Sequence, residues 1–272
     1  MISLEIAAHK PMTANIPTVL ALDFDGVICN GLIEYLETAW RTYCQIWSPP
    51  SQTYAPDLAT CFYRLRPVIE TGWEMPVLIR ALLVGIPEEK IVQDWSGIAQ
   101  HLVKEAGLVA ADVGKKLDQL RDEWIATDLV SWLSLHRFYP GVVERLRLLL
   151  ASPVQPVIVT TKEGRFVKAL LQQQGVQMSE QWIIGKESKR PKHQTIRELI
   201  GVATGTPSEL WFVEDRLKTL QLVQQQLDLD SVKLYLADWG YNTVAEREVA
   251  RHDPKIRLLS LSQFAQDFSA WP

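Results

Sequence analysis

The chain has 272 residues, with 28 Lys and Arg against 32 Asp and Glu, which gives a net charge of −4 at pH 7. At this length the chain can form one large domain or two small ones. Its hydrophobic content of 47% is ordinary for a globular protein and argues against disorder. The acidic balance also argues against a nucleic-acid partner, because binding the phosphate backbone broadly requires a basic face.

The sequence predicts neither a membrane segment nor a secretory signal. No apolar run approaches the roughly 20 residues that span a bilayer. Residues 1–15 lack a basic leader followed by a long apolar core. Cys29, Cys44 and Cys61 have no metal-type spacing and are interpreted as reduced thiols, so we expect a cytoplasmic protein.

The first informative pattern is an apolar run at 18–22 that leads directly into Asp23, Phe24, Asp25 and Gly26. A buried strand that ends in two carboxylates one residue apart brings both to one mouth of a sheet, where open α/β sheets bind ligands. Such a mouth can hold a divalent cation and offer a carboxylate nucleophile. The alternative interpretation is a polar strand end with a helix cap, where Asp is also common.

Residues 29–137 show helical periodicity instead of short apolar runs. Apolar side chains recur at three- and four-residue steps, for example at Leu32, Leu36, Trp40 and Tyr43. The pattern predicts an all-helical insertion, interrupted by a polar break at 70–74.

Strand patterns return after the insertion. A run at 156–160 ends in Thr160 and Thr161, and a hydroxyl at such a strand end can donate to a phosphate oxygen. Strands are also predicted near 182–185, 210–214 and 232–236, separated by helical segments. This alternation predicts an α/β fold with a doubly wound, mostly parallel, Rossmann-like sheet.

The order of these segments resembles the haloacid dehalogenase-like superfamily. Asp23 to Val27 looks like its first motif, Thr160 its second, a lysine near 192 its third, and Glu214 with Asp215 its fourth. The helical insertion is similar to the cap of the phosphoglycolate phosphatase-like branch. The resemblance implies a core domain at 1–28 and 138–272, and a cap domain at 29–137.

The resemblance implies catalytic and metal-binding roles for the acidic residues. Asp23 would be the nucleophile that forms an aspartyl-phosphate, and Asp25 would act as general acid and then as general base. Mg²⁺ would be held by the Asp23 carboxylate, the Asp25 backbone carbonyl and the Asp215 carboxylate. Glu214 would act behind these ligands or through a water.

The phosphate group would be bound by other parts of the same motifs. Thr160 and the backbone amides of Gly26 and Thr161 would hold its oxygens. A lysine would neutralise its charge, and three lie in the basic segment. We favour Lys192, with Lys189 as the second choice and Lys186 as the third.

The break between helical patterns in the cap suggests a substrate contact. We hypothesise that Arg66, Glu70 or Trp73 reads the leaving-group half of the substrate. The alternative is an ordinary helix–helix turn whose charges face solvent.

Together these features predict a Mg²⁺-dependent phosphatase that acts on a small phosphorylated metabolite. A sugar-phosphate mutase of the same family and a noncatalytic phosphate-ester-binding protein with the same fold are the alternatives. The sequence does not predict the substrate or the oligomeric state.

Overall fold

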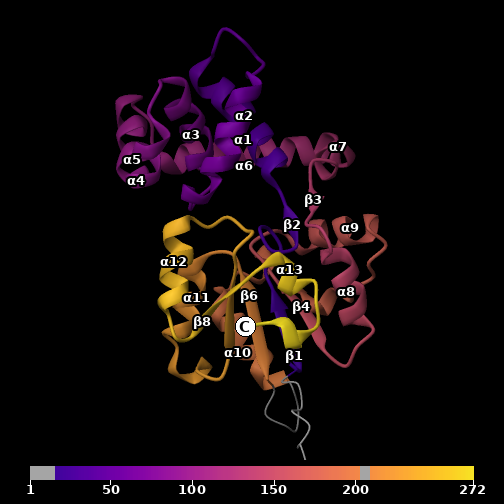
Figure 1. Ribbon diagram of the computed structural model, residues 1–272. Helices are drawn as coiled ribbons and strands as arrows, with labels where there is room; N and C mark the ends of the chain where they lie inside the picture. The colour runs from indigo at the N-terminus through magenta and orange to yellow at the C-terminus, as the bar shows by residue number, and fades with distance from the viewer. Residues whose placement is uncertain (1–15, 203–208) are drawn as a thin grey trace, which may run out of the picture.

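The computed structural model describes residues 16–202 and 209–272 and has two parts (Figure 1). A sheet flanked by helices forms one part, and a group of helices forms the other. The prediction that 1–15 carries no secretory signal falls outside the described residues. No helix in the described ranges is long and apolar enough to cross a membrane.

The first part is built on a six-stranded sheet with the order β5-β4-β1-β6-β7-β8. All of its neighbouring strands run parallel. The strands are β1 (Val19–Leu22), β4 (Gln155–Val159), β5 (Ile183–Ile184), β6 (Leu210–Glu214), β7 (Lys233–Ala237) and β8 (Ile256–Leu259). The predicted doubly wound parallel sheet is therefore confirmed, and the predicted strand positions agree with the observed bounds.

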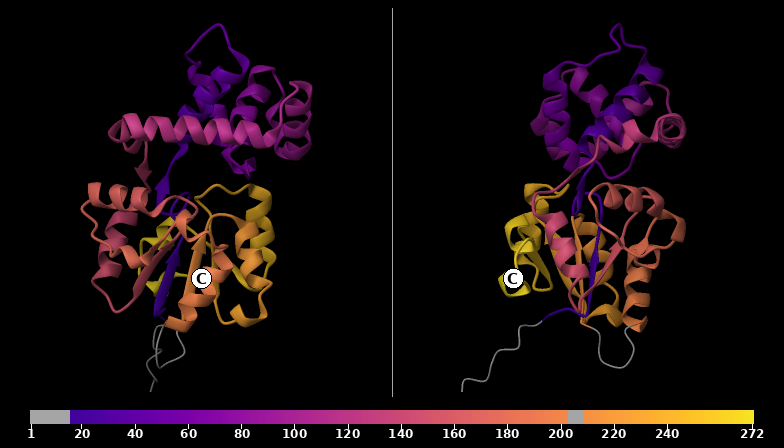
Figure 2. Two further views of the ribbon diagram at one scale, coloured as in Figure 1. Left: turned by 180° about the vertical axis from the view of Figure 1, so that it is seen from behind. Right: turned by 90° about the vertical axis from the view of Figure 1, so that its right-hand side faces the viewer.

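Helices cover both faces of this sheet (Figure 2). Because side chains alternate along a strand, Leu20 and Leu22 of β1 face one hydrophobic cluster, while Val19 and Ala21 face another. The first cluster is shared with α8 (Val142–Leu150), α9 (Gly164–Gln173) and α13 (Leu261–Phe264). The second is shared with α10 (Lys192–Val202), α11 (Leu217–Gln224) and α12 (Val244–His252). Because both faces of the sheet are covered, most residues of the strands are apolar, which made the strands recognisable in the sequence.

The second part is helical, as the sequence predicts. It contains α1 (Leu32–Trp47), α2 (Pro56–Leu65), α3 (Glu74–Leu83), α4 (Glu88–Gln93), α5 (Trp95–Glu105), α6 (Ala110–Thr127) and α7 (Leu129–Leu133). A short 3-10 turn, η1 (Arg66–Val68), follows α2, and the predicted break at 70–74 falls between this turn and the first residue of α3. These helices bury a hydrophobic cluster of their own around Leu36, Phe62 and Leu78. We refer to this part as the cap; its division from the core at 28/29 and 137/138 remains our proposal.

Two short linker strands connect the cap to the core. β2 (Cys29–Asn30) leads into the cap and β3 (Arg137–Phe138) leads out. They pair antiparallel, with Cys29 opposite Phe138 and Asn30 opposite Arg137. The chain therefore leaves the core and returns to it at the same place.

Candidate active site

Three buried carboxylates meet at the carboxyl ends of two neighbouring strands. Asp23 follows β1, Glu214 ends β6, and Asp215 follows β6. β1 and β6 are paired in parallel, with Leu22 opposite Val213, so the residues that follow lie side by side. One oxygen from each carboxylate lies within 4.8 Å of the others, and all three residues are buried. The chain thus brings together acids nearly two hundred positions apart.

Lys192, the first residue of α10, supplies a positive charge to this cluster. Its Nζ lies 2.8 Å from Asp23 Oδ1 and 2.7 Å from Glu214 Oε2. Lys189 instead occupies an exposed left-handed position with φ of 52°, and it has no contact with the acids. Of the two lysines favoured from the sequence, the structure brings Lys192 to the site.

Burial and crowding change the protonation of these acids. Burial, together with Glu214 and Asp25, raises the pKa of Asp23 to about 7, although Lys192 opposes the shift. Burial and the charge of Asp23 raise the pKa of Asp215 to about 6. Burial opposes the charge on Lys192, but Asp23 and Glu214 outweigh it and raise the pKa of that ammonium. The cluster therefore has more negative charge than one lysine balances, and a cation would be stabilised there.

Two glycines allow Asp215 to lie close to the backbone. A Cβ at Gly26 would lie 2.0 Å from Asp215 Oδ2, and a Cβ at Gly240 would lie 2.2 Å from Asp215 Cβ. The backbone N–H of Tyr241 donates to Asp215 Oδ2 at 2.7 Å. The carboxylate is thus fixed in direction by this hydrogen bond, and a side chain at either glycine would collide with it.

Asp25 lies beside a second lysine that the sequence analysis did not assign. Lys162 Nζ is 3.3 Å from Asp25 Oδ2 and 3.4 Å from His136 Nε2. Burial and the charge of Lys162 lower the pKa of His136 to about 4, so this histidine is neutral and can accept from the ammonium. Asp25 Oδ1 has no hydrogen-bond partner among the described residues.

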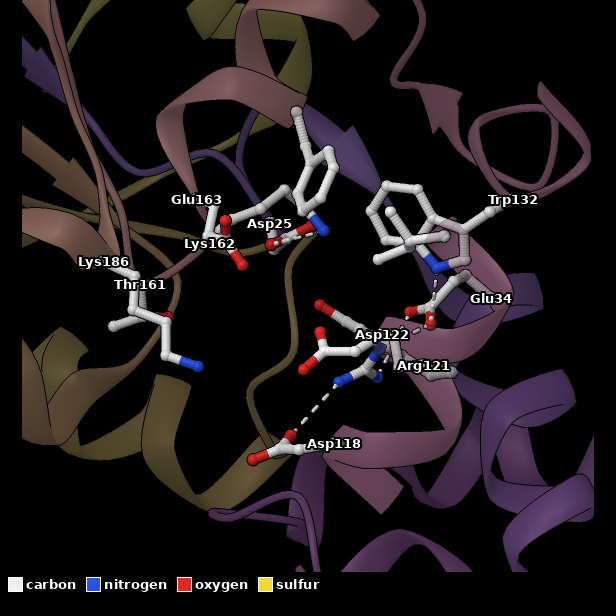
Figure 3. Close-up of a pocket in the computed structure, with 13 residues that line it drawn as sticks. Asp25, Glu34, Asp118, Arg121, Asp122, Trp132, Thr161, Lys162, Glu163 and Lys186 are labelled. Atoms are coloured by element: carbon white, nitrogen blue, oxygen red, sulfur yellow. Dashed lines mark hydrogen bonds and ion pairs between the residues drawn. The ribbon is translucent and has the colours of Figure 1, made fainter. Parts of the chain in front are cut away.

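Two cavities adjoin Asp25 between core and cap. The acid-pair cavity, of about 300 Å³, has the following lining residues: Asp23, Asp25, Tyr35, Arg66, Ile69, Glu70, Thr161, Lys192, Glu214, Asp215, Arg216, Lys218, Thr219, Leu222 and Tyr241. The cap-side cavity, of about 220 Å³, is lined by Asp25, Glu34, Tyr35, Asp118, Arg121, Asp122, Ile125, Trp132, Thr161, Lys162, Glu163, Phe166 and Lys186 (Figure 3). Asp25, Tyr35 and Thr161 line both cavities.

A buried ion pair forms the cap wall of the cap-side cavity. Arg121 Nε donates to Glu34 Oε1 at 2.8 Å, and Trp132 Nε1 donates to the same oxygen at 3.1 Å (Figure 3). Burial alone would raise the pKa of Glu34, but Arg121, Lys162 and the hydroxyl of Thr38 lower it to about 2. This carboxylate is therefore ionised and already paired with Arg121, so its role in the cap wall is structural.

Thr160, Thr161 and Gly26, which were predicted to bind phosphate, differ in the availability of their donors. Thr161 lines both cavities. Thr160 is buried, and its Oγ1 accepts from the backbone N–H of Lys162 at 3.1 Å. The N–H of Gly26 donates to the carbonyl of Cys29 at 2.8 Å, because the chain turns tightly there. That amide is engaged in the turn, so a phosphate contact by Gly26 stays a prediction without a free donor to support it.

The three predicted substrate residues of the cap lie in different environments. Arg66 and Glu70 line the acid-pair cavity, and Glu70 pairs with Lys218 of the core at 2.9 Å. Trp73 lines neither cavity and packs against the hydrophobic cluster of the cap. Its predicted substrate role stays a prediction with no contact to support it.

Several site residues were missed from the sequence. Lys162 could have been found, because it directly follows the strand-end threonines. Tyr241 follows the end of β7 at the same sheet edge, so its position was also open to inference. Glu34 and Arg121 are 87 positions apart on different helices and leave no local signal.

Comparison with known proteins assigns a family to residues 17–222, which match a model described as haloacid dehalogenase-like hydrolase. A phosphoglycolate phosphatase of Pseudomonas putida is 30% identical over 161 residues, which are 56% of this chain and 57% of that relative. Another, from Pseudomonas savastanoi pv. phaseolicola, is 27% identical over 170 residues, or 60% of each chain. The chain therefore spans less than two thirds of the length of these curated relatives.

Solved structures share the fold. A "predicted phosphoglycolate phosphatase" from Haemophilus somnus superposes with a TM-score of 0.58 at 18% identity, over 93% of this chain and 95% of that one. A "predicted phosphatase" from Clostridium acetobutylicum gives a TM-score of 0.54 at 12% identity, over 92% and 97% of the two chains. At these identities the likeness concerns architecture, and it covers both core and cap.

Proposed function

Because the chain belongs to the haloacid dehalogenase-like hydrolases, we propose that it is a Mg²⁺-dependent phosphatase of a small phosphate monoester, acting through an aspartyl-phosphate on Asp23. The observation that carries this proposal is the convergence of the Asp23, Glu214 and Asp215 carboxylates within 4.8 Å, with Lys192 against them. Such a cluster combines a nucleophile, a site for a hard cation and a charge to hold phosphate.

The donor set fits magnesium. Mg²⁺ prefers oxygen ligands and keeps several waters, and the cluster offers buried carboxylate oxygens beside a cavity. Asp23 and Asp215, with the Asp25 backbone carbonyl, would hold the ion. Glu214 is engaged by Lys192 and by the backbone N–H of Arg216 at 3.0 Å, which suits a position behind the ligands. When bound, the ion would neutralise charge on the phosphoryl oxygens.

The chemical steps would use the residues of this chain in two stages. An Asp23 oxygen attacks phosphorus, the ester P–O bond breaks, and the proton of Asp25 passes to the leaving oxygen. Water then attacks the aspartyl-phosphate while Asp25 takes its proton, which releases inorganic phosphate and regenerates Asp23. Lys192 and the Thr161 backbone, with the Thr160 hydroxyl, would hold the phosphoryl oxygens, and Lys189 is the weaker alternative to Lys192.

The relatives and the thiols refine the proposal. Curated relatives in Pseudomonas are named phosphoglycolate phosphatases, so phosphoglycolate is the first compound to test.

The three cysteines are free, which fits the reducing cytoplasm that we propose as the location.

Replacement of the nucleophile tests the mechanism. Asp23→Asn keeps the shape of the side chain but removes the attacking oxyanion, so we expect Mg²⁺-dependent phosphate release from phosphoglycolate or p-nitrophenyl phosphate to disappear. Continued Mg²⁺-dependent release by this variant would refute the aspartyl-phosphate. An isomerised ester as the wild-type product would favour a mutase, and tight ester binding without turnover would favour a binding protein.

A further inference from the structure

Lys162 lies between the proposed acid–base residue of the core and two aromatic residues of the cap. Figure 3 shows it beside Asp25 at the cap-side cavity, where its Nζ is 3.3 Å from Asp25 Oδ2 and its side chain is only 9% exposed. The same Nζ lies 3.4 Å from His136 Nε2 and 5.3 Å from the ring centre of Trp132. This ammonium therefore joins the two parts of the molecule at the site.

His136 is oriented to accept a hydrogen bond from Lys162. An ammonium only donates, so His136 Nε2 is the acceptor and Nδ1 carries the ring hydrogen. Nδ1 then donates to the carbonyl of Trp132 at 3.2 Å, and the two rings pack edge-on with their centres 4.6 Å apart. Trp132 is fixed in turn, because its Nε1 donates to Glu34 Oε1 at 3.1 Å. Packing within the cap thus sets the position of the acceptor.

Other charged residues line the cap-side cavity without pairing with either member of the Asp25–Lys162 pair. Glu34 and Asp118 both face Arg121, at 2.8 and 3.8 Å. Glu163 pairs with an arginine of α9 at 2.8 Å. Within residues 16–202 and 209–272, the two members of the pair have no other ion-pair partner. Besides this pair, the charged lining residues are Glu34, Asp118, Arg121, Asp122, Glu163 and Lys186.

The Asp25 carboxylate depends on Lys162 for its orientation. Its Oδ1 is buried and has no hydrogen-bond partner among the described residues, and Lys162 is the ion-pair partner of Oδ2. A buried oxygen without a partner is unfavourable, so the observed orientation is maintained by the attraction of Lys162 for the other oxygen. Without the ammonium, the carboxylate would gain by turning away.

We propose that Lys162 is a positioning residue that holds the Asp25 carboxylate toward the leaving oxygen, and that His136 of the cap holds Lys162 in place. This inference rests on the proposed phosphatase function, in which Asp25 gives its proton to that oxygen. Lys162 and His136 take no part in the bonds that form and break. The cap thereby assists the first chemical step through the acid of the core.

The test uses two esters that differ in their need for a proton. Phenyl phosphate and p-nitrophenyl phosphate have similar shapes, but p-nitrophenolate leaves readily without protonation and phenolate does not. Because a positioned general acid contributes about 10²- to 10⁴-fold, Lys162→Met should lower kcat/KM on phenyl phosphate about tenfold or more. On p-nitrophenyl phosphate the loss should be less than about threefold, since little proton transfer is needed. Lys162→Arg keeps the cation and should retain most of the wild-type rate on both esters.

The role of His136 is tested in the same way. His136→Phe keeps a ring against Trp132 but removes the acceptor, so it should lose several-fold on phenyl phosphate and little on p-nitrophenyl phosphate. His136→Gln keeps an acceptor for Lys162 and should resemble the wild type. Lys186→Met is the matched control, because it removes a lysine from the same cavity, and any loss that it causes should fall equally on both esters. Partial unfolding does not imitate these results, since the inactive fraction cancels in the ratio of the two kcat/KM values.

Equal losses of Lys162→Met on both esters, or a gain on phenyl phosphate, would overturn the positioning role. Crystal structures of the ligand-free wild type and variants keep this result separate from the phosphatase proposal, because they need no turnover. The Asp25 carboxylate should turn away in Lys162→Met and stay in Lys162→Arg. If the wild type hydrolyses neither ester but the carboxylate behaves in this way, the positioning stands and the phosphatase does not. A carboxylate that keeps its orientation in Lys162→Met would overturn the positioning whatever the turnover.

Discussion

The core and the cap contribute to the site in different ways. The clustered carboxylates of the core lie at the ends of strands of one parallel sheet, so backbone pairing fixes their mutual distances. The groups of the cap come from α1, η1 and α6, and reach the site through helix packing and a few polar bonds. Arg216 of the core donates to the carbonyl of Pro67 in the cap at 3.1 Å, and Lys218 pairs with Glu70. The difference teaches that, under the proposed function, the sheet would set the chemistry, while selection would be set by a part that can be altered separately.

The largest expected effect falls on the core. Asp215→Asn retains an oxygen for the Tyr241 N–H but removes a charge from the acid cluster. We expect kcat/KM to fall about 10³-fold, the scale of losing one preorganised electrostatic group, and the Mg²⁺ concentration for half-maximal rate to rise. Thermal unfolding with and without Mg²⁺ should show that the stabilisation by the ion is lost as well.

Asp238→Asn is the control, since Asp238 follows β7 but lies outside the acid cluster. It should keep the wild-type response to Mg²⁺. An unchanged response in Asp215→Asn would remove Asp215 from the ion site.

The next effect concerns the stability of the cap. Because Glu34 is buried with a pKa of about 2 against an ordinary 4.5, its ionised form contributes about 3 kcal/mol to folding at neutral pH. The folded state binds this proton less tightly, so the contribution is complete above pH 4.5 and is lost as the pH falls toward 2. Glu34→Gln should lower the free energy of unfolding by about that amount at pH 7. In urea titrations below pH 4.5, the difference in unfolding free energy between variant and wild type should become smaller.

A double-mutant cycle provides the control for this pair. Arg121→Met alone leaves Glu34 buried and unpaired, so it should cost as much as Glu34→Gln or more. The double variant should lose less than the sum of the two. Additive losses would show that the pair is not the source of the stability.

The smallest effects fall on the contacts between the two parts. Arg216 is half-buried and bonded to carbonyls of Pro67 and Tyr241, at 3.1 and 2.6 Å, so Arg216→Met should raise KM several-fold with little change in folding stability. Lys218→Met breaks an exposed pair and should change kcat/KM by less than about twofold. A larger loss in Lys218→Met than in Arg216→Met would reverse this ranking of the contacts.

The sequence predicted the core better than the cap, for a physical reason. Strands buried on both faces appear as short apolar runs, and their carboxyl ends must lie along one edge, so Asp23 and Asp215 could be expected to lie together. Lys192 begins a helix and was chosen among three lysines through the family resemblance. Thr160 is buried and Thr161 is exposed where the chain bends after β4, a difference that a motif does not resolve. In the cap, Glu34 and Arg121 meet only through helix packing. Helical periodicity predicts which face is buried, but it does not predict which helices become neighbours.

The antiparallel pairing of β2 with β3 has a consequence for engineering. Since Cys29 pairs with Phe138 and Asn30 pairs with Arg137, the two ends of the insertion lie side by side and are joined by strand pairing. An inserted domain whose two ends lie side by side can be replaced by another domain with the same spacing between its ends. The backbone of the core would not have to move. Under the proposed function, a different cap could therefore be joined to this core, changing substrate specificity without altering the acid cluster.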